Sequence, residues 1–221
     1  MQDTWVVVPL YNEEAVIGEV VRRVRDTFPK VVCVDDGSVD HSAAAAEAAG
    51  AAVVRHPVNL GQGAALQTGL EYACLDPAMR YVVTFDADGQ HRVDDAVAMV
   101  DRLRRGEADV VFGSRFLDDR TDPGLLKRLV LKTAVTYTNL TTGVHLTDSH
   151  NGLRALTRAV AERLDIRQNR MAHASEITAQ VGRERFRYVE EPVHILYTDY
   201  SRAKGQSLLN SVNILAEMLF K

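Results

Sequence analysis

The feature that most constrains the fold is a repeated order of short apolar runs and amphipathic segments in the first half of the chain. Each apolar run is continuous, which is typical of strands buried on both faces of a parallel sheet. The segments between the runs carry apolar residues at helical spacing. The expected strands are residues 5–8, 31–34, 52–54, 81–85 and 110–112, and the expected helices are residues 15–24, 43–49, 64–74 and 94–105. This alternation predicts an α/β fold with a mostly parallel central sheet flanked by helices.

A polar cluster follows each expected strand. Turns are often rich in Asp, Asn and Gly for local reasons. Ligands of open α/β sheets, however, bind outside the carboxyl ends of the strands. The clusters are Tyr11–Glu13, Asp35–Ser38, Asn59–Gly63, Asp86–Gln90 and Gly113–Arg115. We therefore expect one cleft to collect these residues.

The cluster after the fourth expected strand contains two carboxylates. Residues two apart on a strand point the same way, so Asp86 and Asp88 are expected side by side. Two like charges repel, and a hard divalent cation relieves that repulsion. A plain turn is the alternative, because Asp and Gly are common turn residues. We predict that Asp86 and Asp88 hold Mg²⁺ or Mn²⁺.

Composition narrows the class of protein. A length of 221 residues favours a single domain, and the net charge of −4 argues against nucleic acid as a main partner. Cys33 and Cys74 lie in apolar surroundings and are expected to be buried free thiols, as in a reducing cytosol. No signal peptide or transmembrane stretch is visible, so we expect a cytoplasmic location, peripheral to the inner face of the membrane. A membrane segment in a longer protein stays compatible with the sequence.

The alternation ends after Arg115. We expect a nucleotide-sugar-binding half (1–115), an irregular acceptor-side half (116–205) and a C-terminal amphipathic helix (206–221). Within the second half, helices are predicted over 125–142, 158–164 and 174–181, and a strand or turn over 153–156. A strand over 187–195 contains Pro192 and is therefore expected near a sheet edge. The terminal helix could pack on the domain, lie on a membrane or meet a partner protein.

Six motifs in order resemble those of family 2 glycosyltransferases of the GT-A fold. They are PLYNEE, VDDGSVD, NLGQGAALQTG, FDADGQH, GSRF and DSHNGLRAL. Within that family the chain most resembles the dolichyl- or polyprenyl-phosphate sugar synthases, from Thr4 to about Leu209. The resemblance implies metal-dependent, inverting transfer of a hexosyl group from a UDP- or GDP-sugar to a polyprenyl phosphate at the cytoplasmic membrane face.

The same resemblance assigns residues to the nucleotide. Pro9, Tyr11 and Glu13 would line its pocket, and Asp36 would accept a hydrogen bond from the ring N–H of the base, with Asp35 beside it. An N-terminal cap for the next helix is an equal interpretation of Asp35.

Other motif residues are assigned to the phosphates and the metal. Gly61 and Gly63 would let backbone amides approach a phosphate. Relatives carry Lys where this chain has Gln62, so the cationic phosphate contact is either missing or supplied elsewhere, by Arg55 or Arg115. Asp86 and Asp88 would hold the metal, and Gln90 would lie near the metal or its waters. Asp86, Ala87, Asp88 and Gln90 would together bind the nucleotide sugar, and Arg115 would face the phosphates.

The acceptor side depends on what attacks the sugar. A hydroxyl must lose a proton to a base, whereas a lipid phosphate is already anionic. Asp148 or Glu176 is the candidate base for a hydroxyl; for a lipid phosphate, Asp148 would position metal or sugar. Asn151 and Arg154 would bind sugar hydroxyls or phosphate, and Arg154 could equally pair with an acid. Arg202 and Lys204 would bind the acceptor phosphate, and Asp88, Asp148, Arg115 and Arg202 are the expected catalytic residues.

Two alternatives remain at this point. One is transfer to a sugar hydroxyl in cell-surface polysaccharide assembly, and the other is a nucleotide-sugar-binding subunit without catalysis. A small membrane-anchoring protein and a homo-oligomer are further partners compatible with the sequence.

Overall fold

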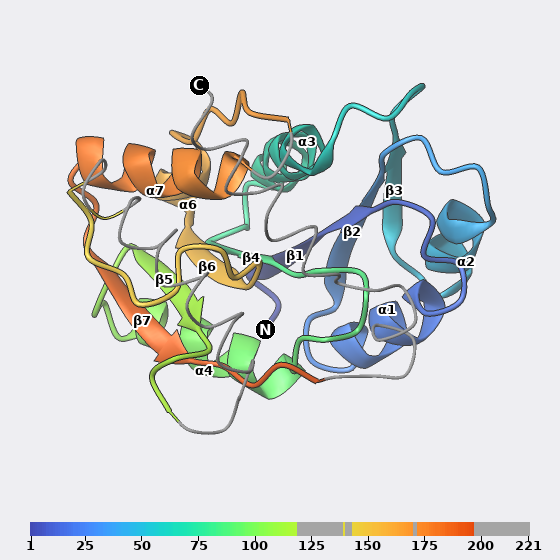
Figure 1. Cartoon of the computed structure of the whole chain (residues 1–221). Coiled ribbons are helices and arrows are strands. Elements are labelled where there is room, and N and C mark those ends of the chain that lie inside the picture. The colour runs from blue at the N-terminus through green and yellow to red at the C-terminus, as the bar shows by residue number, and fades with distance from the viewer. Residues whose placement is uncertain (119–138, 140–142, 170–171, 197–221) are drawn as a thin grey trace.

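The computed structural model describes residues 1–118, 139, 143–169 and 172–196. In this part of the chain, seven strands form one sheet with helices on both faces (Figure 1). The elements in chain order are β1 (Thr4–Leu10), α1 (Ile17–Arg25), β2 (Lys30–Asp35), α2 (Ser42–Ala48), β3 (Ala52–Arg55), α3 (Gln62–Cys74), β4 (Tyr81–Thr84), α4 (Val93–Arg104), β5 (Val110–Ser114), β6 (Arg154–Thr157), α6 (Arg158–Ala161), α7 (His173–Arg183) and β7 (Tyr188–Pro192). The predicted five strands and four helices of the first half are confirmed.

The strand order is β3-β2-β1-β4-β6-β5-β7. Strands β1 to β4 pair in parallel, as do β5 and β7. Strand β6 lies between β4 and β5 and is antiparallel to both. The mostly parallel sheet is therefore confirmed. The position of β6 was not predicted, because a run of four residues carries no information about which strands it will pair with.

Both faces of the sheet are buried, which explains the continuous apolar runs. On one face Val6, Val83 and Val111 pack in a core with residues of α1, α2 and α4. On the other face Val7, Val82 and Val110 pack with residues of α3, α6 and α7. Figure 1 shows these two sets of helices on opposite sides of the sheet. Consecutive strand residues thus alternate between two cores.

The second half of the chain matches the predictions less closely. Strand β7 ends at Pro192 and lies at the sheet edge, as expected. Helix α6 is shorter than the predicted segment 158–164. The predicted helix 125–142, apart from residue 139, lies outside the described residues, as do the tail 206–221 and the residues Arg202 and Lys204. None of the described helices has the length and apolar character needed to cross a bilayer.

Both cysteines are free thiols, as predicted. Cys33 is fully buried in β2, and this burial, with the charge of Asp35, raises its pKa to about 12. Cys74 is only half-buried at the end of α3.

Candidate functional site

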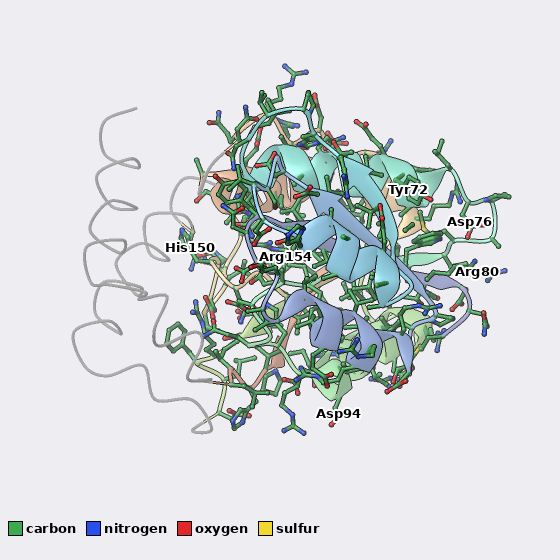
Figure 2. All side chains as sticks on the ribbon, turned by 90° about the vertical axis from the view of Figure 1, so that its right-hand side faces the viewer. Tyr72, Asp76, Arg80, Asp94, His150 and Arg154 are labelled. Atoms are coloured by element: carbon green, nitrogen blue, oxygen red, sulfur yellow. The ribbon has the colours of Figure 1, made fainter. Side chains whose placement is uncertain are left out.

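A cavity of about 440 Å³ lies at the carboxyl ends of the parallel strands. Its size is typical of a small-molecule site. All five polar clusters contribute residues to its wall, so the structure brings together what the sequence placed on five separate turns. The predicted residues that line it are Pro9, Tyr11, Glu13, Asp36, Gly61, Asp86, Ala87, Asp88, Gln90, Arg115, Asn151 and Arg154. Figure 2 shows His150, which also lines the cavity, at the opposite end of the molecule from Tyr72, Asp76 and Arg80.

Asp86 and Asp88 follow β4 and share the cavity wall. His91 Nε2 lies 2.9 Å from Asp86 Oδ2, and Gln62 Nε2 donates to Asp86 Oδ1 at 3.3 Å. Burial alone would raise the pKa of Asp86, but the hydrogen bond and charge of His91 hold it below its ordinary value. Burial and the neighbouring charge of Asp86 raise the pKa of Asp88 to about 6. The two carboxyl groups therefore differ in pKa, because His91 stabilises the charge of Asp86 whereas burial and the charge of Asp86 oppose ionisation of Asp88.

This donor set fits a hard divalent cation that is completed by a ligand. Two carboxylates are available, and the described residues contain no group of three acidic, His or Cys side chains arranged around one ion. Mg²⁺ is commonly held in this way, by one or two carboxylates together with substrate phosphates. The raised pKa of Asp88 comes first from burial and then from repulsion by Asp86, and a bound cation would offset that repulsion.

The carboxylate of Asp36, directly after β2, takes part in three hydrogen bonds. Its Oδ1 accepts from the Leu60 amide at 2.9 Å and lies 2.8 Å from His56 Nδ1, and its Oδ2 accepts from the Gly61 amide at 2.7 Å. His56 Nε2 lies 3.0 Å from Thr68 Oγ1, so the ring connects Asp36 to α3. A carboxylate offers about four acceptor positions. Three are used by described residues, which leaves about one for a ligand.

Asp35 does not line the cavity. Its carboxylate accepts from the Ser38 amide at 3.1 Å and closes the turn after β2. The alternative of a helix cap is also not what the structure shows, because α2 begins at Ser42 and the residue before it, His41, makes no capping bond with its side chain. The amide of Ser42 instead donates to Asp40.

Gly61 and Gly63 pack against the backbone of Gln168 and Asn169. The Gly63 amide donates to Asn169 O at 3.0 Å. A Cβ atom at Gly61 would lie 2.1 Å from Asn169 O, and one at Gly63 would lie 2.0 Å from Gln168 O. The two glycines thus let the segment before α7 pack against the start of α3. Gly63 does not line the cavity, and no phosphate contact through its amide follows from this geometry.

Arg115 and Asp148 form a buried ion pair. Arg115 donates from Nε to Oδ2 at 2.6 Å and from Nη2 to Oδ1 at 2.8 Å, and its backbone amide also reaches Oδ2 at 3.2 Å. The Asp148 side chain is 1% exposed and does not line the cavity. Burial alone would raise its pKa, but the adjacent guanidinium holds the pKa of Asp148 below its ordinary value. The ionised form of Asp148 is therefore favoured, and its carboxylate orients Arg115.

Glu176 also holds a backbone segment in place. Its Oε2 accepts from the amides of Arg167 and Gln168, at 3.0 and 2.8 Å, in the segment that covers α3. It does not line the cavity. Arg55, offered as an alternative phosphate contact, is exposed at the end of β3, 3.9 Å from Glu47, and likewise lies outside the cavity wall.

Three histidines line the cavity that the sequence analysis did not single out: His91, His150 and His173. His91 and His150 stand inside quoted motifs, so their position among cluster residues was an available signal. His173 begins α7 and carried no such signal. Burial lowers the pKa of His150 to about 4, so its imidazole is neutral at pH 7.

Comparison with known proteins agrees with this geometry. Residues 5–165 match the family model described as "Glycosyl transferase family 2". The chain is 32% identical to the polyprenol monophosphomannose synthase of Mycolicibacterium smegmatis, with 100% of this chain and 85% of that protein covered. It is 27% identical to a UDP-N-acetylglucosamine–dolichyl-phosphate N-acetylglucosaminyltransferase of Methanococcus voltae, with 97% and 94% covered.

Among solved structures, the chain is similar to glucosyl-3-phosphoglycerate synthase from Mycobacterium tuberculosis in complex with Mn²⁺, UDP and phosphoglyceric acid. The TM-score is 0.72 at 18% identity, and 99% of this chain and 78% of that chain are covered. At this identity the likeness shows the GT-A fold.

Proposed function

The chain belongs to glycosyl transferase family 2, and from that premise we propose that it transfers a hexosyl group from a UDP- or GDP-sugar to a polyprenyl phosphate. We propose further that the transfer depends on Mg²⁺ or Mn²⁺, inverts the anomeric configuration and takes place at the cytoplasmic face of the membrane. The names of the two relatives, which concern dolichyl phosphate and polyprenol, support the class of acceptor.

The observation that carries the choice of acceptor is the state of the two acids that could act as a base. Asp148 is buried and held by Arg115 through both carboxylate oxygens. Glu176 accepts two backbone amides outside the cavity. A hydroxyl acceptor needs a base to remove its proton, whereas an anionic phosphate oxygen attacks without one. Because both carboxylates are already engaged by donors of the protein, neither is placed to remove a proton, and this favours a phosphate acceptor.

The proposed reaction needs no proton transfer. One oxygen of the acceptor phosphate forms a bond to the anomeric carbon from the face opposite the diphosphate, and the bond from that carbon to the diphosphate oxygen breaks. Asp36 would fix the base through its remaining acceptor position, and Arg115 would present its charge, oriented by Asp148, to the phosphates. Asp86 and Asp88 would hold the metal, which when bound neutralises charge on the departing nucleoside diphosphate.

Transfer to a sugar hydroxyl is the second candidate, and one observation favours it. His150 lines the cavity as a neutral imidazole that could accept a proton. Its lowered pKa of about 4 makes it a weak base at pH 7, so we rank this candidate second.

The test is transfer of label into lipid. The protein is incubated with Mn²⁺, undecaprenyl phosphate in detergent and a panel of radiolabelled UDP- and GDP-hexoses, and the organic extract is counted before and after mild acid. We expect acid-labile label in the lipid phase with at least one donor, and its loss on chelation with EDTA. Label that enters only an added oligosaccharide would instead establish the hydroxyl acceptor.

A further inference from the structure

Two side chains of the segment just before and within β6 present unpartnered donors to the cavity. Arg154 is 1% exposed and Asn151 is 4% exposed, and both line the cavity wall. Within the described part of the chain, Arg154 Nε, Arg154 Nη1 and Asn151 Nδ2 are buried and have no hydrogen-bond partner. The amide oxygen of Asn151, by contrast, accepts from the Leu153 amide at 2.9 Å. Only the donor end of Asn151 is therefore left over among these contacts.

This segment is fixed against the predicted metal carboxylate. A Cβ atom at Gly152 would lie 2.2 Å from Asp86 Oδ2, so the backbone between Asn151 and Arg154 packs directly on that carboxylate. Arg154 itself is paired across the sheet with Thr84, two residues before Asp86. The unpartnered donors thus stand beside the place where diphosphate and metal would meet.

A buried guanidinium without hydrogen bonds is costly to maintain. Burial lowers the pKa of Arg154 to about 10, against the opposing effect of the Asp86 and Asp148 charges, so the group is still charged at pH 7. The two carboxylates supply charge at a distance, but neither accepts a hydrogen bond from Arg154 Nε or Nη1. A ligand that brings both negative charge and acceptor oxygens would satisfy this group, and a neutral sugar hydroxyl would not supply the charge.

The other cations and amides near the cavity are already engaged. Arg115 holds Asp148, Arg55 lies outside the cavity wall, and the Gly63 amide at the start of α3 donates to Asn169 O. Gln62 contacts Asp86. In the described chain, the buried nitrogens of cavity-lining side chains that lack a partner are Asn151 Nδ2, Arg154 Nε, Arg154 Nη1 and His91 Nδ1. The His91 ring already contacts Asp86 through Nε2, so Asn151 and Arg154 supply most of the unused donors.

We propose that Asn151 and Arg154 form a subsite for phosphoryl oxygens beside Asp86. Arg154 supplies the charge and two N–H donors, and Asn151 supplies a third donor through its amide nitrogen. The subsite rests on the proposed function for its ligand, which is either the diphosphate of the donor or the phosphate of the acceptor. Both sources present the same chemistry to these two residues.

The test measures binding, so it does not depend on turnover. Wild-type protein and the variants Arg154→Lys and Asn151→Asp are titrated, each with Mn²⁺ present, with UDP, GDP, the two nucleosides and farnesyl phosphate, using ligand-observed NMR. Lys keeps the charge but not the fork of donors. Asp keeps the oxygen that the Leu153 amide needs and replaces the donor by an acceptor. Arg163→Gln is the matched control, because that side chain is 63% exposed, does not line the cavity and lies 3.7 Å from Glu184.

We expect both variants to bind one class of phosphorylated probe at least about tenfold more weakly, since each lost hydrogen bond involves a charged group. Nucleoside binding and the control should match wild type. Loss confined to UDP or GDP assigns the subsite to the donor diphosphate, and loss confined to farnesyl phosphate assigns it to the acceptor.

Three results would overturn the subsite: unchanged affinity for every phosphorylated probe, an equal fall in nucleoside affinity, or no binding of any phosphorylated probe to wild type. A wild type that binds these probes through Arg154 but transfers no sugar would instead overturn the proposed function and leave the subsite standing. Thermal unfolding of each variant shows whether it is folded. If Arg154→Lys does not fold, Asn151→Asp alone tests the subsite.

Discussion

Asp36 and Arg154 are both buried charged side chains in the wall of one cavity, yet they differ in how many hydrogen bonds the described chain makes to them. Asp36, at the end of β2, is bonded to two backbone amides and to His56. Arg154, in β6, has two buried donor nitrogens without a partner in the described chain. The first charge is stabilised mainly by the fold, and the second is left for a ligand. Stability and binding should therefore respond differently when each is removed.

The largest effect is expected at Asp36. Asp36→Ala leaves the Leu60 and Gly61 amides and the His56 ring without their acceptor, so the free energy of unfolding should fall by about 4 kcal/mol. Urea denaturation measures the change. Asp94→Ala, at a side chain that is 82% exposed, is the control and should stay within about 0.5 kcal/mol of wild type. A similarly small effect at Asp36 would remove the contrast between the two regions.

His150 should make the stability of the fold depend on pH. It is next to Asn151 in the chain, and burial disfavours its protonated form. Its pKa is lowered from 6.5 to about 4, so the unfolded chain takes up the proton first. Stability should therefore fall as the pH decreases from about 6.5 towards 4, by at most roughly 3 kcal/mol for this group. His150→Gln should lose that slope relative to wild type, and His41→Gln, at an exposed position, should retain it. Parallel pH profiles for wild type and His150→Gln would contradict the assignment.

Asp88 should show a smaller effect of the opposite sign. Its pKa is raised to about 6, so above that pH the ionised group reduces the stability of the fold when no cation is bound. At pH 7, without metal, Asp88→Asn should raise the free energy of unfolding by roughly 1 kcal/mol, and the gain should shrink below pH 6. The same variant should lose the thermal shift that Mn²⁺ with UDP or GDP gives to wild type. A less stable Asn variant at pH 7 would show that Asp88 is satisfied within the chain, as Asp36 is.

The smallest change in stability is expected at Arg154. Arg154→Met keeps the volume and removes a buried charge that has unmet donors, while it takes a counter-charge away from Asp86. These effects oppose each other, so the free energy of unfolding should stay within about 1 kcal/mol of wild type. Chemical denaturation beside Asp36→Ala gives the direct comparison. A loss as large as that of Asp36→Ala would mean that Arg154 is a structural cation.

Sequence reasoning located the cavity because local patterns report burial and strand ends. The continuous runs at Val6–Val8 and Val31–Val34 indicated strands covered on both sides, and the polar residues after them marked one edge of the sheet. The family resemblance placed Gly61 and Gly63 at a phosphate, and the structure packs residues 168–169 against both glycines. A missing side chain permits a close approach without specifying what approaches.

What the sequence by itself determined is the α/β alternation, the family and the set of residues that meet at the carboxyl edge, since each follows from short-range periodicity or from the order of motifs. Only the tertiary structure decided that β6 runs antiparallel between β4 and β5, that Asp148 holds Arg115 from 33 residues away, and that Arg154 enters the cavity wall without a hydrogen-bond partner for Nε or Nη1 in the described chain. The physical reason is that periodicity records whether a side chain is buried, whereas its partner is set by which distant strands pair, and that choice leaves no local mark.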